Sequence, residues 1–188
     1  MRAVVVYESM YGNTHQVAEA IGAGLEPACS VTVVPVSQVT AESLAGADLV
    51  VVGGPTHLHG MSRAATRKSA AGEARKPGSG LELDPDASGP GLREWLGSLG
   101  RHQAKAAAFD TRLHGPGALT GRASKGVARS LRAHGFDLAA KPESFLVTRK
   151  NQLDPRETER ARAWGSALAA TIAPRLARDT GSVFEWRR

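Results

Sequence analysis

The stretch from residue 3 to residue 17, AVVVYESMYGNTHQV, passes from an apolar run directly into a loop of hydrogen-bonding residues. Residues 2–7 form a continuous apolar run, which is typical of a strand in the middle of a parallel sheet. Residues 13–25 follow with apolar side chains at helical spacing. The loop between them offers N–H groups, hydroxyls and an amide but no Lys or Arg, and it precedes a helix N-terminus, which attracts anions. We therefore predict a phosphate site built from neutral donors; the alternative is that Asn13 only caps a tight turn.

The rest of the chain repeats this alternation of short apolar runs and longer helical patterns. Four further strands are predicted, at residues 30–36, 48–54, 104–110 and 136–148, the last interrupted near Pro142. Helices are predicted at residues 40–47, 62–75, 92–99 and 123–134, and from Asp154 to about Arg178. Five strands that alternate with helices imply an α/β fold with a parallel sheet, right-handed crossovers and helices on both faces. We expect a single domain over residues 1–188.

Residues 76–91, KPGSGLELDPDASGPG, are dense in Gly, Pro, Ser and Asp. Neither flank is a complete domain without the other, so the segment is better interpreted as a loop than as a linker. We predict a mobile surface loop at 76–91.

The composition narrows the class of protein. The formal net charge is +6 and the pI is near 10.0, but the basic residues are scattered and the aromatic content is only 5%, which argues against nucleic-acid binding. The charge favours an acidic partner instead.

No apolar stretch approaches the roughly 18 residues that span a membrane, so we expect no membrane segment. Cys29 is the single cysteine, which excludes an internal disulfide, and we expect a cytoplasmic protein.

The sequence matches neither an ATP-type phosphate loop nor a complete metal site. The nearest approach to an ATP-type phosphate loop is GPGALTGRAS at 115–124, where Pro116, Arg122 and Ala123 occupy the required Gly, Lys and Ser/Thr positions. A metal pair at His57 and His59 is conceivable because alternate residues of an extended segment share a face. No third ligand is evident nearby, so we predict no metal site.

Three motifs resemble those of the flavodoxin family. ESMYGNT at 8–14 is similar to the flavodoxin phosphate loop, GGPTHLHGMS at 53–62 to the flavin loop after the third strand, and FDTRLHGPG at 109–117 to the loop after the fourth. Their order and strand context agree along the whole chain. The resemblance implies a flavodoxin-like three-layer sandwich with a five-stranded parallel sheet in the order 2-1-3-4-5, and FMN as cofactor.

The resemblance also implies which residues contact FMN. The phosphate would be held by the first loop: Ser9, Met10 through its N–H, Tyr11, Gly12, Asn13 and Thr14. The ribityl chain and the ring would be bordered by the second loop: Pro55, Thr56, His57, Leu58, His59 and Gly60, the last with its backbone near N5. The opposite side would be approached by the third loop: Asp110, Thr111, Arg112 and Leu113. The loop at 76–91 would lie near the flavin edge.

The function that follows is electron transfer through bound FMN, with no catalytic residue assigned. Flavodoxins that act as carriers are usually acidic and often cover the ring with aromatic side chains, whereas this chain is basic and supplies histidines. Positive charge from His57, His59, Arg112 and His114 would favour the anionic reduced flavin and raise its potential. The electron acceptor would be an acidic redox protein or a small molecule. An FMN-dependent NAD(P)H:quinone-type oxidoreductase is the alternative, and a flavin-free binding module with this fold is a third possibility.

Overall fold

A computed structural model describes residues 1–172 of the chain. The predicted end of the last helix, near Arg178, lies outside the described residues. No helix in this part of the chain has both the length and the apolar character needed to cross a bilayer.

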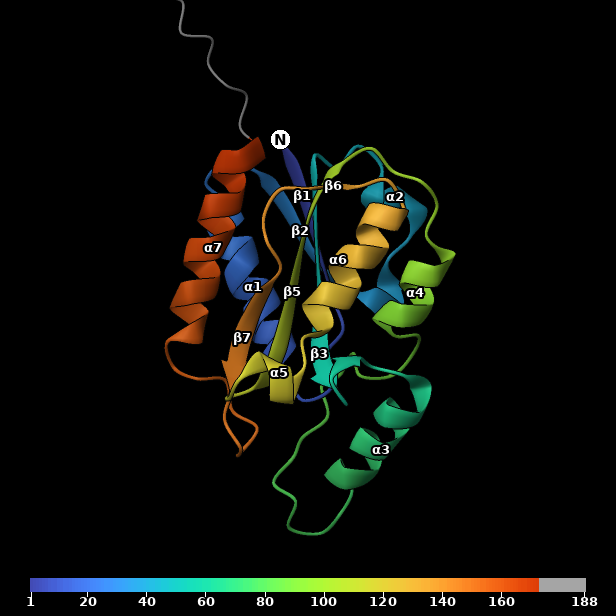
Figure 1. The fold of residues 1–188 in the computed structure, drawn as a ribbon, viewed down its shortest axis with the longest axis vertical. Helices are drawn as coiled ribbons and strands as arrows, with labels where there is room; N and C mark the ends of the chain where they lie inside the picture. Colours follow the sequence, from blue (N-terminus) through green and yellow to red (C-terminus); the bar gives the residue numbers. More distant parts are fainter. Residues whose placement is uncertain (173–188) are drawn as a thin grey trace, which may run out of the picture.

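One twisted sheet forms the middle layer (Figure 1). Its parallel strands are β1 (Arg2–Tyr7), β2 (Ser30–Pro35), β3 (Leu49–His57), β5 (Lys105–Leu113), β6 (Asp137–Leu138) and β7 (Glu143–Val147). The order is β2-β1-β3-β5-β6, and β7 also pairs with β5. The predicted order 2-1-3-4-5 is therefore confirmed, with the fifth strand divided into β6 and β7. The break includes Pro142, which has no N–H to donate to a ladder.

Helices cover both faces of this sheet, as predicted (Figure 1). One face is covered by α1 (Asn13–Leu25) and α7 (Glu157–Ile172), and the other by α2 (Ala41–Leu44), α4 (Leu92–Ser98) and α6 (Ala123–Ala133). Three short elements complete the fold: η1 (Val36–Gln38), β4 (Gly60–Met61), which pairs antiparallel with β3, and α5 (Gly117–Thr120). The helix α3 (Ala64–Ala74) buries none of its residues and lies at the carboxyl end of the strands.

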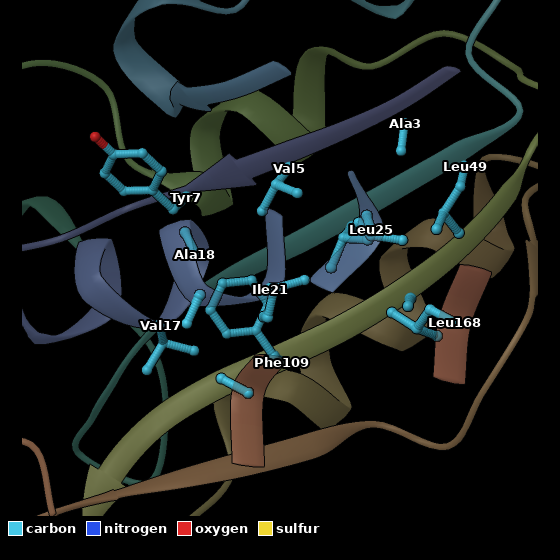
Figure 2. Packing of buried hydrophobic residues seen from close by; sticks show 14 of the residues in the cluster. Ala3, Val5, Tyr7, Val17, Ala18, Ile21, Leu25, Leu49, Phe109 and Leu168 are labelled. Carbon is cyan, nitrogen blue, oxygen red and sulfur yellow. The ribbon is translucent and has the colours of Figure 1, made fainter. Parts of the chain in front are cut away.

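Alternation along β1 divides the core into two halves. Val4 and Val6 pack on the side of α4 and α6, whereas Val5 packs with Ile21 and Phe109 on the side of α1 and α7 (Figure 2). All five side chains are fully buried. Because successive residues of a strand point to opposite faces, a run of consecutive valines fills both halves at once.

Two glycines set the distance between α1 and α7. A Cβ on Gly24 would overlap the carbonyl oxygen of Arg162, and a Cβ on Gly165 would overlap the carbonyl oxygen of Ile21. The two backbones therefore approach as closely as they do only because both positions lack a side chain. This contact fixes α1, whose first turn forms part of the candidate site.

Two strands extend beyond their predicted ends. β3 continues through Pro55 to His57, and β5 continues to Leu113, because the two strands pair as far as Pro55 and Thr111. β1 ends at Tyr7, which pairs with Gly53, so β1 does not pair with Pro55. The missing N–H of Pro55 therefore removes no hydrogen bond between β1 and β3. The third loop of the predicted site thus begins later than expected, and Asp110–Leu113 belong to a strand.

Residues 76–91 contain no helix or strand, in agreement with the predicted loop. Their middle is nevertheless anchored: the N–H of Asp84 donates to the carbonyl of Met10 at 2.9 Å, and the Tyr7 hydroxyl donates to Asp86 at 3.0 Å. Asp84 is buried. The composition did not indicate this packing, and the mobility of the segment stays a prediction.

Candidate ligand-binding site

A cavity of about 190 Å³ lies where the carboxyl ends of β1, β3 and β5 meet. The residues that line it come from all three predicted loops: Met10, Tyr11, Asn13, Thr14, Pro55, Thr56, His57, Thr111, Arg112, Leu113, Val147 and Asn151. All of them except Val147 and Asn151 belong to the predicted site. In an open parallel sheet this edge, where the strand order reverses between β1 and β3, is the usual position of a ligand.

The first turn of α1 forms one wall of the cavity. Gly12 begins the helix with φ +84°, a conformation that favours glycine, and its N–H donates to the hydroxyl of Ser9 at 3.1 Å. Within residues 1–172, the N–H groups of Asn13 and Thr14 make no hydrogen bond. Unpaired N–H groups at the positive end of a helix attract an anion. Ser9 itself is buried and does not line the cavity.

Three hydrogen bonds tie this turn to distant parts of the chain. The hydroxyls of Thr14 and Thr111 lie 2.7 Å apart, and the amide of Asn13 donates to the backbone and side-chain oxygens of Asn151 at 3.1 and 3.2 Å. Asn151 adopts φ +56°, which Asn tolerates better than most residues. The predicted phosphate ligands are thus held in place from β5 and from the turn after β7.

The end of β3 supplies the next wall. The hydroxyl of Thr56 accepts the N–H of Ala123 at 3.0 Å, which joins β3 to the start of α6. His57 is partly buried, and this burial lowers its pKa below the ordinary value; the carboxylate of Glu8 acts in the opposite sense and Arg67 in the same sense. The neutral imidazole is therefore favoured near pH 7, so His57 does not supply the positive charge expected from the sequence.

The rest of the second loop turns away from the cavity. Leu58 and His59 link β3 to β4 with φ values of 44° and 71°, as both central residues of a type I′ turn do. Leu58 is 85% exposed, and His59 and Gly60 line a different depression beside α5 and α6. The structure does not bring these three predicted residues to the cavity.

Asp110 is likewise absent from the cavity lining, because it is fully buried beneath it. One carboxylate oxygen accepts the N–H of Ser124 at 2.7 Å, and the other has no hydrogen-bond partner within residues 1–172. Burial raises the pKa of Asp110, although the N–H of Ser124, the hydroxyls of Ser124 and Ser144 and the charge of Arg112 act in the opposite sense. Its role in the structure is to cap the start of α6.

Arg112 brings a positive charge to the cavity. Its Nη1 donates to the carbonyl of Gly115 at 2.7 Å and to the hydroxyl of Thr120 at 3.0 Å, so the loop after β5 holds the guanidinium in place. Its Nε is buried and has no partner within the described residues. His114 is exposed and does not line the cavity. Of the four groups expected to bring positive charge near the ring, Arg112 and His57 line the cavity, whereas His59 and His114 do not.

A network behind the cavity was missed by the sequence reasoning. Glu8 is buried and accepts hydrogen bonds from the Ser62 hydroxyl and, at 2.7 Å, from the N–H of Leu92. Arg67 donates to Ser62 at 3.3 Å and to Glu94 at 3.1 Å. Glu8 could have been recognised as a candidate because it is an acidic residue directly after a buried strand. Asn151 could have been recognised because it follows the fifth strand, at the same edge of the sheet.

Comparison with known proteins agrees with this arrangement. Residues 4–67, from β1 into α3, match the flavodoxin domain family model. A flavodoxin from the domain Archaea superposes with a TM-score of 0.62 at 22% identity, covering 92% of this chain and 99% of that one. The chain is flavodoxin-like.

Other flavodoxin-like structures show the same fold. Megasphaera elsdenii flavodoxin gives a TM-score of 0.53 at 18% identity over 89% of this chain and 98% of its own. Rubredoxin oxygen:oxidoreductase from Desulfovibrio gigas gives 0.55 at 20% identity over 92% of this chain, but only 37% of that larger protein is covered. A search of curated proteins finds no significant match. These superpositions establish the shared flavodoxin-like fold.

Proposed function

We propose that this flavodoxin-like protein binds FMN in the cavity between β1, β3 and β5 and transfers electrons through it. The observation that carries the proposal is the convergence of residues 10, 11, 13 and 14 with residues 55–57 and 111–113 around one cavity, beside the first turn of α1. These segments are far apart in the sequence, and each was expected to contact the same cofactor.

The chemistry of the lining fits a phosphate ester. The N–H groups of Asn13 and Thr14 are unpaired within the described residues, and the Thr14 hydroxyl lies beside them. A phosphate that accepts these donors needs no basic residue in the loop, because the helix terminus supplies part of the positive potential. The Nε of Arg112 is a further donor without a partner in residues 1–172.

The cavity is smaller than the roughly 300–1,000 Å³ typical of a site that encloses a whole cofactor. The phosphate and part of the ribityl chain fit within about 190 Å³, so the rest of FMN would lie outside that volume. Bound FMN would supply one- and two-electron redox chemistry. Arg112 would stabilise negative charge on the reduced ring, whereas the neutral His57 would contribute a hydrogen-bonding group without a full charge.

The basic surface suggests what exchanges electrons with the flavin. A net charge of +6 attracts acidic redox proteins and anionic small acceptors. Screening over roughly 10 Å at 0.1 M salt weakens such attraction, so the reaction rate with an acidic acceptor should fall as salt is added. A rate independent of salt would contradict this choice of partner.

A pair of glycine variants tests FMN binding. Gly12 and Gly46 have similar conformations, φ +84° and +68°, and neither has a close neighbour that a Cβ would strike, but only Gly12 lies in the predicted phosphate loop. We expect Gly12→Val to abolish FMN binding, measured by quenching of flavin fluorescence, and Gly46→Val to retain it. Equal affinities in the two variants would contradict the proposed phosphate site.

A reductase role is the second candidate, and one observation favours it. Among the residues that line the cavity, Tyr11 is the one Phe, Tyr or Trp, and its hydroxyl is already bound to the carbonyl of Ala70 at 2.8 Å. Fewer aromatic side chains would leave a ring face open to a nicotinamide. Anaerobic mixing of the FMN-loaded protein with NADPH or NADH distinguishes the two roles: rapid bleaching near 450 nm supports a reductase, and slow bleaching supports a carrier.

A further inference from the structure

Three potential metal ligands meet on the outer side of the first turn of α1. His15 comes from α1, and Asp84 and Asp86 come from the irregular segment 76–91. One ligand atom from each residue lies within 4.8 Å of the other two. No sequence motif indicates this group, because the histidine is far along the chain from both carboxylates.

Asp84 is the member whose environment calls for a cation. Its side chain is 1% exposed, and its Oδ2 has no hydrogen-bond partner within residues 1–172. The other oxygen accepts the N–H of Asp86 at 3.0 Å, and the backbone N–H of Asp84 is bound to Met10. The carboxylate is therefore fixed in position with one buried oxygen unsatisfied, a costly arrangement unless a donor or a cation is supplied.

The unsatisfied oxygen faces His15. The Nδ1 atom of His15 lies 3.3 Å from Asp84 Oδ2 without forming a hydrogen bond, and its Nε2 lies 3.6 Å from the carboxylate of Glu19. A metal ion that binds here would displace any proton from Nδ1 and leave an Nε2–H that faces Glu19, so that the lone pairs of Nδ1 and of Asp84 Oδ2 would both face the ion. Two lone pairs that face each other across this distance are a natural place for a metal ion.

The remaining groups orient the cluster. The Tyr7 hydroxyl donates to Asp86 at 3.0 Å, and Gln38 donates to the other oxygen of Asp86 at 3.2 Å. The imidazole of His15 stacks on the Tyr7 ring, with centroids 4.5 Å apart and planes at 19°. Hydrogen bonds and packing of this kind hold metal ligands in place in known sites.

We propose that His15, Asp84 and Asp86 bind a divalent cation of the Zn²⁺ type. One imidazole and two carboxylates form a nitrogen–oxygen set that suits Zn²⁺, and the two negative charges balance its charge. Tetrahedral bonds of 2.0–2.1 Å place ligand atoms about 3.3 Å apart. The Nδ1–Oδ2 distance already has this value, and a ligand atom of Asp86 lies within 4.8 Å of the other two ligand atoms.

The site is open to solvent on one side. His15 and Asp84 line a pocket of about 750 Å³, whose rim also carries Glu19, Glu82 and Glu159 and one basic residue, Arg162. This acidic rim stands out on a chain of net charge +6, and it would raise the local concentration of cations. The pocket supplies an entry path and leaves room for water or an exogenous ligand at the fourth position.

Zinc titration of the full chain, without a histidine tag and after treatment with a chelator, tests the proposal. Calorimetry should give one Zn²⁺ per chain. His15→Gln should lower the affinity at least about tenfold, the smallest loss typical for altered metal sites. The matched control is His102→Gln, because His102 stacks on Phe136 away from the cluster. Equal affinity in wild type and His15→Gln, or an equal loss in His102→Gln, would overturn the site.

A second measurement separates metal binding from folding. Asp84→Asn removes a buried carboxylate and could unfold the segment, whereas His15 and Asp86 are only partly buried, so His15→Gln and Asp86→Asn should fold. We expect Zn²⁺ to raise the melting temperature of the wild type and of His102→Gln but not of His15→Gln or Asp86→Asn. Stabilisation by Zn²⁺ that persists in both cluster variants would show that the ion binds elsewhere.

Discussion

The hydroxyl oxygens of Thr14 and Thr111 lie 2.7 Å apart, although 97 residues separate them in the chain. Both side chains are buried. The contact joins the first turn of α1 to the end of β5 across β3, so it forms only when β1, β3 and β5 have the observed order. The geometry of the proposed phosphate site therefore depends on the topology of the whole sheet.

Thr14→Ala should weaken FMN binding by about 1–3 kcal/mol, the range for a lost hydrogen bond to a charged group. Titration of flavin fluorescence measures the loss. Thr32→Ala is a suitable control, because Thr32 lies on β2 with an exposed side chain. An unchanged affinity in Thr14→Ala would place the phosphate elsewhere.

His57 predicts a pH dependence of stability. Burial lowers its pKa in the folded state, so between that pKa and the ordinary value of about 6.5 the unfolded chain binds more protons. The free energy of unfolding should therefore fall as the pH drops below about 6.5, and this cost should be absent above it. Urea unfolding of wild type and His57→Gln from pH 5 to 8 measures the contribution. Parallel pH profiles would show that His57 does not contribute.

Replacement of Asp110 by Asn should destabilise the protein less than replacement by Ala. Its pKa is raised by burial, so a charge on this side chain costs more free energy than it does in water, while its oxygen caps α6 at Ser124. Asp110→Asn keeps an acceptor and should unfold at a similar or higher urea concentration at pH 7. Asp110→Ala loses the cap and should cost about 0.5–2 kcal/mol. A lower midpoint for the Asn variant than for the Ala variant would contradict this role.

Gly165→Ala should destabilise the protein by about 1–3 kcal/mol, because the added methyl group would overlap the carbonyl oxygen of Ile21 on α1. Gly72 lies in the helix α3 with open space around it. Gly72→Ala should therefore stabilise the protein by about 0.5–1 kcal/mol through its helix propensity. Thermal unfolding of both variants distinguishes the steric effect at Gly165 from the effect of helix propensity at Gly72. Changes of the same sign in the two melting temperatures would argue against close helix packing at Gly165.

The sequence predicted the architecture well because its signals are local. The valines mark β1 by their continuous apolar run, and the polar loop that follows marks the start of α1. Gly135, which adopts a positive φ, marks the end of α6. Strand order predicted that the three loops meet, since the carboxyl ends of parallel strands lie at one edge, and the resemblance to flavodoxins implied that Met10, His57 and Arg112 belong to the site.

Side-chain direction could not be predicted in the same way. The I′ turn at Leu58 and His59 sends His59 away from the cavity, and neither residue is a type that normally signals such a turn. The extension of β5 put Asp110 inside the sheet, where all residues from 106 to 111 are buried. The anchoring of Asp84 depends on contacts with residues some seventy positions earlier, which no local pattern encodes.

The divided fifth strand has a consequence for self-association. A long, unbroken margin of a sheet can recruit a strand from a second molecule, and natural proteins interrupt such margins. Beyond β5 the margin consists of the two-residue β6 and the five-residue β7, separated by the stretch that contains Pro142. At the opposite margin, β2 ends at Pro35. The interrupted margin beyond β5 is therefore a poor template for intermolecular pairing, and at the opposite margin Pro35 offers no N–H to a further strand at the end of β2.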